Sequence, residues 1–116
     1  MSILTYRAMK RQPAPEYETR EVTVPSHWGM YTSAGNKSIM KKAQKLVNRI
    51  EGEKKYTKKL DLFGAFFKGW RKLQNTKNMS EASDTDVREQ VWGFACIVAK
   101  AVNVDEESLD KIWDEL

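Results

Sequence analysis

Lysine and arginine are concentrated in one stretch of this chain, and their spacing suits the binding of an anion. Residues 37–72 contain 12 Lys or Arg and 3 Asp or Glu. Lys41, Lys45 and Arg49 recur every four residues, so in a helix they project from one side. A row of such cations can bind a phosphate backbone, because each contact releases condensed counterions. The sequence therefore predicts a basic helical face that contacts nucleic acid.

The predicted nucleic-acid contacts extend beyond this row into the segment that follows it. They are Lys41, Lys42, Lys45, Arg49, Lys54, Lys55, Lys58 and Lys59. Most are lysines, which favours contact largely without sequence specificity, since base edges are usually read by Arg, Asn and Gln. A face that only meets solvent would give a similar pattern. Such faces usually mix both signs of charge, whereas the first helix has no acid before Glu51.

The two parts of the chain carry charges of opposite sign. Residues 1–79 contain 17 Lys or Arg and 6 Asp or Glu, a balance of +11, while residues 80–116 contain 3 and 10, a balance of −7. The net charge is +4. Such separation is typical of a basic binding face with an acidic back. It is equally compatible with two faces that neutralise each other, within one molecule or between copies in a homo-oligomer.

Residues that could carry out catalysis are few and isolated. His27 is the single histidine, and it has no Cys or acid at the spacing of a metal site. Cys96 lies in an apolar segment without a histidine partner, which is typical of a small buried hydrophobe. Gly64 and Gly69 have the spacing of a phosphate loop but lack the Lys and Ser or Thr that complete it. We therefore predict a binding protein, not an enzyme, with no cofactor and no metal.

Hydrophobic periodicity predicts the helices that position these residues. We expect them at residues 38–51, 58–74, 85–102 and 105–116. The third is apolar around most of its circumference, which is typical of a buried helix. Its apolar arc consists of Val87, Val91, Phe94, Ala95, Ile97, Val98, Ala101 and Val102. Truncating Phe94 or Ile97 to Ala should therefore lower the free energy of unfolding by about 2–5 kcal/mol.

Capping residues indicate where two of these helices begin. Ser38 is the expected N-cap of the first helix, since its hydroxyl can accept a hydrogen bond from a free backbone N–H. Asp105 is the expected N-cap of the last helix. Val104 and Leu109 flank it at the positions of a hydrophobic staple.

The second helix combines an aromatic side with a cationic one. Its apolar arc consists of Leu60, Leu62, Phe63, Phe66, Phe67, Trp70 and Leu73. A helix at a membrane interface has this pattern. The residues for such a membrane contact, or for a protein partner, would be Phe66, Trp70, Arg71 and Lys72. A helix that packs its aromatic side inside a bundle has the same pattern, and we favour this interpretation because the third helix needs large apolar partners.

Residues 1–36 form a separate segment before the helical domain of residues 37–116. Partial alternation at residues 3–8 and 17–24 predicts either a short β-hairpin or an extended arm. Trp28 and Tyr31 are expected to cover the edge of the core. The predicted fold class is a mainly α, small single-domain bundle of about four helices with an extended N-terminal arm or short β-hairpin. The length of 116 residues suffices for one hydrophobic core.

A structural or adaptor protein of matrix-like type is the alternative function. It would bind an anionic membrane surface or an acidic protein partner and would self-associate. The segment Pro-Ala-Pro-Glu-Tyr at residues 13–17 is similar to the proline-rich recruitment motifs of viral matrix proteins, although it lacks their Pro-Pro-x-Tyr form. A viral structural protein is the hypothesis that this resemblance implies. The chain shows neither a signal peptide nor an apolar run of about 20 residues, so we expect a cytoplasmic or otherwise intracellular location.

Overall fold

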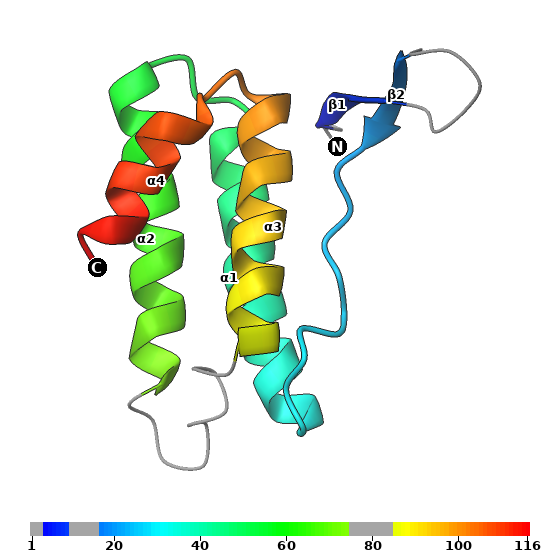
Figure 1. Cartoon of the computed structure of the whole chain (residues 1–116), viewed down its shortest axis with the longest axis vertical. Helices are drawn as coiled ribbons and strands as arrows, with labels where there is room; N and C mark the ends of the chain where they lie inside the picture. The colour runs from blue at the N-terminus through cyan, green and yellow to red at the C-terminus, as the bar shows by residue number, and fades with distance from the viewer. Residues whose placement is uncertain (1–3, 10–16, 75–84) are drawn as a thin grey trace.

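The computed structural model describes residues 4–9, 17–74 and 85–116, which form a bundle of helices with a hairpin beside it (Figure 1). In chain order the elements are β1 (Thr5–Met9), β2 (Tyr17–Glu21), α1 (Ser33–Ile50), α2 (Tyr56–Gln74), α3 (Thr85–Ala101) and α4 (Glu106–Asp114). Within these residues the fold is mainly helical, with four helices and one two-stranded sheet. The predicted fold class is confirmed.

The N-terminal segment forms the hairpin that was one of its two expected structures. β1 and β2 pair antiparallel, with Thr5 opposite Glu21. A further backbone hydrogen bond, from Val22 N to Leu4 O at 2.8 Å, continues the pairing. The connector at residues 10–16, which holds most of the proline-rich motif, lies outside the described residues. β1 contacts α3, and the segment after β2 runs along the bundle to the start of α1 (Figure 1).

α1 begins at Ser33, so the prediction of Ser38 as its N-cap was wrong. Thr32 has the extended backbone of an N-cap, and its hydroxyl accepts a hydrogen bond from Gly35 N at 3.0 Å. Residues 33–37, which precede the predicted start of the helix, form its first turn. Gly35 packs closely on Met30: a Cβ at this position would lie 2.6 Å from Met30 Cε and 3.2 Å from Met30 Cβ, so the Met30 side chain would have to shift.

Asn36 fixes the segment that leads into α1. Its side chain is buried, with 9% exposed. Its Oδ1 accepts hydrogen bonds from the backbone N–H groups of Trp28 at 2.7 Å and Met30 at 3.3 Å. Its Nδ2 donates to the carbonyl oxygens of Met30 at 3.1 Å and Thr32 at 3.2 Å. One amide therefore closes the turn that carries Trp28 into the core.

Replacing Asn36 with Ala should lower the free energy of unfolding by about 1–3 kcal/mol, because buried backbone groups of Trp28 and Met30 lose their partners. Urea unfolding followed by circular dichroism measures this loss. Asn48→Ala is the matched control, since Asn48 is exposed and its Oδ1 accepts a hydrogen bond from Gln44 at the surface. Equal losses in the two variants would contradict the anchoring role of Asn36.

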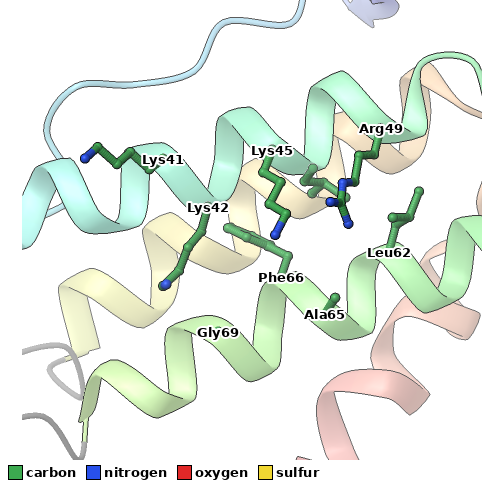
Figure 2. A pocket seen from close by; sticks show the side chains of 9 residues that line it. Lys41, Lys42, Lys45, Arg49, Leu62, Ala65, Phe66 and Gly69 are labelled. Carbon is green, nitrogen blue, oxygen red and sulfur yellow. The ribbon is translucent and has the colours of Figure 1, made fainter.

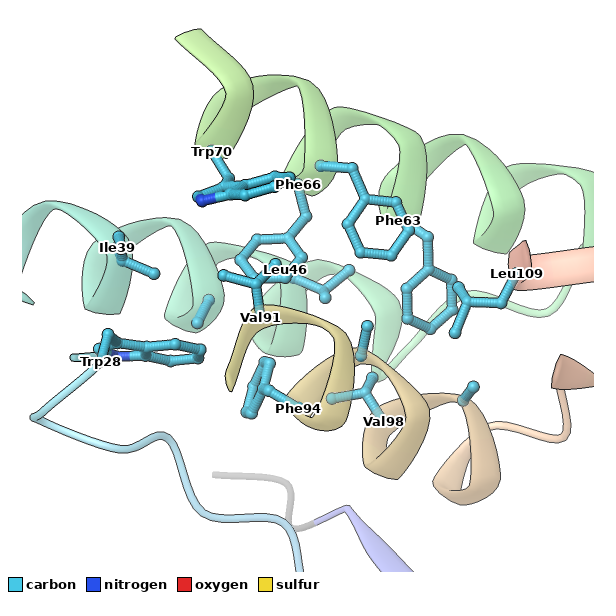
Figure 3. Close-up of a cluster of buried hydrophobic side chains, with 14 of the residues drawn as sticks. Trp28, Ile39, Leu46, Phe63, Phe66, Trp70, Val91, Phe94, Val98 and Leu109 are labelled. Atoms are coloured by element: carbon cyan, nitrogen blue, oxygen red, sulfur yellow. The ribbon is translucent and has the colours of Figure 1, made fainter. Parts of the chain in front are cut away.

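The core lies where α1, α2 and α3 face one another, and Trp28 closes one side of it (Figure 3). The ring centroid of Phe94 is 5.3 Å from that of Trp28 and 6.0 Å from that of Phe66. Trp28 has no exposed surface, and its Nε1 donates a hydrogen bond to Pro25 O at 2.7 Å. Phe94 of α3 thus joins α2 to the segment before α1.

Ile97 and Tyr31 are among the residues that were expected at the core but lie outside it. Ile97 is half-buried and is not part of the buried cluster. The buried arc of α3 is turned away from Ile97, because Trp92 on the other side packs its ring on Phe67 of α2 and Trp113 of α4. Tyr31, expected beside Trp28, is 85% exposed.

The aromatic side of α2 lies inside the bundle. Phe66 is 4% exposed and Trp70 is 3% exposed. The ring of Trp70 stacks on Trp113 of α4, with centroids 5.1 Å apart and planes at 9°. The interpretation of this helix as a bundle helix is therefore confirmed. Neither aromatic ring is available at the surface for the alternative contact with a membrane or partner.

The starts of α2 and α4 meet the end of α3 at one end of the bundle. Asn103 adopts the left-handed conformation with φ 59°, and Val104 N donates to Ala99 O at 2.9 Å. This is the closing bond of a Schellman motif. Asp105 is the N-cap of α4 by position, as predicted, but its carboxylate accepts a hydrogen bond from the Tyr56 hydroxyl instead of capping its own helix. That hydrogen bond holds the pKa of Asp105 below its ordinary value.

Candidate polyanion-binding groove

A groove with a volume of about 320 Å³ runs between α1 and α2 (Figure 2). The residues that line this α1–α2 groove are Lys41, Lys42, Lys45, Leu46, Arg49, Leu62, Ala65, Phe66 and Gly69. α1 supplies every charged residue of the lining, and α2 supplies only apolar side chains and a glycine. The structure therefore brings together along one groove the four bases that were predicted on the first helix.

Helical spacing directs most of these bases across the groove. In Figure 2, Lys42, Lys45 and Arg49 point from α1 toward α2. Lys41 points along α1, away from the middle of the groove. Lys42 crosses α2 at Gly69, where an added Cβ would lie 3.2 Å from Lys42 Cδ. The absence of a side chain at position 69 therefore lets the Lys42 stem lie close to α2.

The α1–α2 groove is electropositive because its cations are not neutralised locally. No Asp or Glu is among the lining residues. Within the described part of the chain, Lys41, Lys42, Lys45 and Arg49 form no ion pair with a carboxylate. Like charges on adjacent turns raise the local positive potential, and a concave surface focuses it. An anion in the groove would relieve this repulsion.

The remaining predicted contacts do not all extend the groove. Lys54 and Lys55 are exposed in the connection between α1 and α2. Lys58 is exposed one helical turn before Leu62, so it lies on the groove side of α2. Lys59 has a structural partner instead: its Nζ donates a hydrogen bond to Val102 O at 3.0 Å. It stabilises the C-terminal end of α3, where carbonyl groups lack helical partners.

Arg71 and Lys72, the cationic part of the alternative membrane contact, are exposed near the end of α2. They line a separate depression of about 330 Å³ together with Lys68, Glu115 and Leu116. This depression includes an acid, and the aromatic residues predicted with the two bases are buried in the core. The structure thus separates this set of four residues into a buried pair and an exposed pair.

The residues with the most reactive side chains lie apart from the groove. His27 is exposed, and its Nδ1 lies 3.3 Å from Asn36 Nδ2 beside the turn before α1. Cys96 is half-buried, and burial, aided by the nearby charges of Glu106 and Asp110, raises the pKa of its thiol to about 11. The thiolate, the nucleophilic form, is therefore scarce at neutral pH.

The described residues include neither a candidate metal site nor a membrane-spanning helix. No group of three or more His, Cys, Asp or Glu in residues 4–9, 17–74 and 85–116 could hold a metal ion. None of the helices in these ranges is long and apolar enough to cross a membrane.

The sequence pattern located the bases of the groove but not its other wall. Leu62 and Ala65 belong to α2, and their part in the groove depends on how α2 packs against α1. Gly69 was noted only for a phosphate-loop spacing. Its role as the crossing point of Lys42 could not be read from one helix alone.

The sequence matches no protein-family model, no curated protein and no solved structure at a significant level.

Proposed function

We propose that this protein binds nucleic acid, largely without sequence specificity, through the α1–α2 groove. The observation that carries the proposal is the convergence of Lys42, Lys45 and Arg49 on a groove without an acid in its lining. Each cation that neutralises a phosphate releases counterions, which supplies most of the affinity of non-specific binding.

The length of the basic row suits a phosphate backbone. From position 42 to position 49 an α-helix rises about 10 Å, at about 1.5 Å per residue. One strand of a duplex places a phosphate about every 3.4 Å along its axis. The row therefore spans about three phosphate-to-phosphate spacings of one strand. Flexible lysine stems can adjust to these positions without requiring a particular base sequence.

A structural or adaptor protein that binds an anionic membrane or an acidic protein partner is the second candidate. The apolar wall of the groove, formed by Leu62 and Ala65, favours it, since this wall could contact the apolar part of such a ligand. Phe66 and Trp70 are buried, so membrane contact through this face would be mainly electrostatic.

The salt dependence of oligonucleotide binding tests the proposal. With the four bases of the groove in contact, the slope of log K against log salt concentration should be about −3.6 for duplex and about −2.8 for single strands. Fluorescence anisotropy with labelled mixed-sequence oligonucleotides measures it, and vesicles of phosphatidylserine and phosphatidylcholine serve as the parallel arm. Binding to vesicles without binding to either oligonucleotide would favour the adaptor function. Oligonucleotide binding with a slope near zero would contradict the proposal.

A further inference from the structure

We infer that the α1–α2 groove also receives the acidic face of α4 from a second copy of this chain, so that the protein self-associates head to tail. The inference concerns a protein–protein contact and does not depend on nucleic-acid binding. It rests on two charged rows that lie on different sides of one molecule and match each other in spacing and sign.

The acidic row lies along the exposed side of α4. Glu106, Glu107, Asp110 and Asp114 are all exposed, and none forms an ion pair within the described part of the chain. Another side of the helix is held in the core by Leu109, which has no exposed surface. Acids in the first turn are explained by the helix dipole. Asp110 and Asp114 lie beyond that turn, so the dipole does not account for them.

The basic and acidic rows have the same spacing. Glu106, Asp110 and Asp114 repeat every four residues, as do Lys41, Lys45 and Arg49 on α1. Each row covers eight residues of helix rise, about 12 Å. Two helices laid side by side can therefore bring each carboxylate opposite one cation. Glu107 lies beside the acidic row and Lys42 lies beside the basic row, so each row has one further charge of its own sign.

The geometry of the single molecule prevents it from pairing its own rows. α4 packs on α2 and α3, and α2 separates it from α1 (Figure 2). The groove opens between α1 and α2, on the other side of α2 from α4. The row of one copy is thus free to meet the groove of another. Such a contact joins two different surfaces, so repeated contacts form rings or open chains instead of a closed pair.

A second copy is the occupant that the charges favour. The basic part of the chain has a charge balance of +11, and the part that ends with α4 has a balance of −7. Every copy therefore carries both a basic and an acidic binding surface, and the two surfaces are always present at equal concentration. Exposed ion pairs are individually weak and are screened by salt. Self-association should therefore appear at low ionic strength and high protein concentration and disappear in about 0.5 M salt.

Charge-swap variants test the contact by sedimentation velocity at low salt. One variant carries Lys41→Glu, Lys45→Glu and Arg49→Glu, and the other carries Glu106→Lys, Asp110→Lys and Asp114→Lys. The wild-type protein should show a weight-average mass that rises with concentration. Each variant alone should stay monomeric, because its two rows now have the same sign. An equimolar mixture should associate again, since the acidic α1 of one variant meets the basic α4 of the other.

A wild-type protein that stays monomeric at low salt overturns the inference, and so does a mixture of folded variants that stays monomeric. Circular dichroism checks that both variants are folded. If the lysine variant of α4 does not fold, Glu106→Gln, Asp110→Asn and Asp114→Asn replace it, and this neutral variant must show reduced association. The α4 variants keep the groove intact, so their oligonucleotide affinity should not fall. Loss of self-association and loss of nucleic-acid binding are thus measured separately.

Discussion

Replacing Phe94 with Ala is expected to lower the free energy of unfolding by about 3–5 kcal/mol, the range for truncating a buried phenylalanine. Phe94 is 5% exposed, and its ring lies edge-on to both Trp28 and Phe66. The truncation would leave a cavity where α2, α3 and the segment before α1 meet. Urea unfolding monitored by circular dichroism measures the loss.

Ile97→Ala is the control for this prediction, because it removes apolar atoms from the same helix outside the buried core. Ile97 is half-buried, so its truncation should cost about 1 kcal/mol or less. The structure thus lowers the loss expected at Ile97 below the range of about 2–5 kcal/mol predicted from the sequence. A loss at Ile97 as large as that at Phe94 would contradict the observed orientation of α3.

Reversing the charge of Lys41, Lys45 and Arg49 together should weaken oligonucleotide binding by on the order of 100-fold or more. Each lost contact contributes up to about 1 kcal/mol, and each introduced carboxylate repels the phosphates by a similar amount. The salt slope should become shallower by about 3. The fold should persist, since all three side chains are exposed and the apolar side of α1 is unchanged. Fluorescence anisotropy gives the affinity and circular dichroism the fold.

The matched control places the same charge change elsewhere. Arg88→Glu, Lys100→Glu and Lys111→Glu alter three exposed bases on α3 and α4. Both triple variants move the net charge from +4 to −2, because each converts three positive residues to negative ones. The control should retain most of the wild-type affinity. Equal weakening in the two variants would show that net charge, and not the groove, determines binding.

The helices could be predicted from the sequence because their apolar residues recur with helical periodicity. The start of α1 could not, because residues 33–37 are mostly polar and carry no apolar repeat. Their helical structure depends on the hydrogen bond from Gly35 to Thr32 and on the contacts of Asn36 with Trp28 and Met30. No local sequence pattern indicates that these residues contact one another.

Tertiary packing also decided which side of a helix is buried. Most of the apolar arc predicted for α3 is buried in the structure. Ile97 lies outside the core because α2 and α4 cover the side of α3 that carries Trp92. The role of Lys59 could not be predicted from the charge pattern either. In the sequence it continues a basic run, whereas in the structure its amino group binds Val102 O.

The candidate site could be predicted as a row of charges but not as a groove. The spacing of Lys41, Lys45 and Arg49 is sufficient to place three cations on one side of a helix. A groove needs a second wall, and that wall depends on the packing of α2 and on the close approach at Gly69. The structure adds this concave shape to the predicted charge.

Chemical-shift mapping by NMR tests the location of the binding site most directly. A short mixed-sequence oligonucleotide is titrated into ¹⁵N-labelled wild-type protein at low salt, at a protein concentration low enough to keep the protein monomeric. The largest amide shifts should fall at Lys42, Lys45 and Arg49 on α1 and at Gly69 on α2. Shifts that leave these four residues unchanged and cluster on the hairpin or on α4 would contradict binding in the α1–α2 groove.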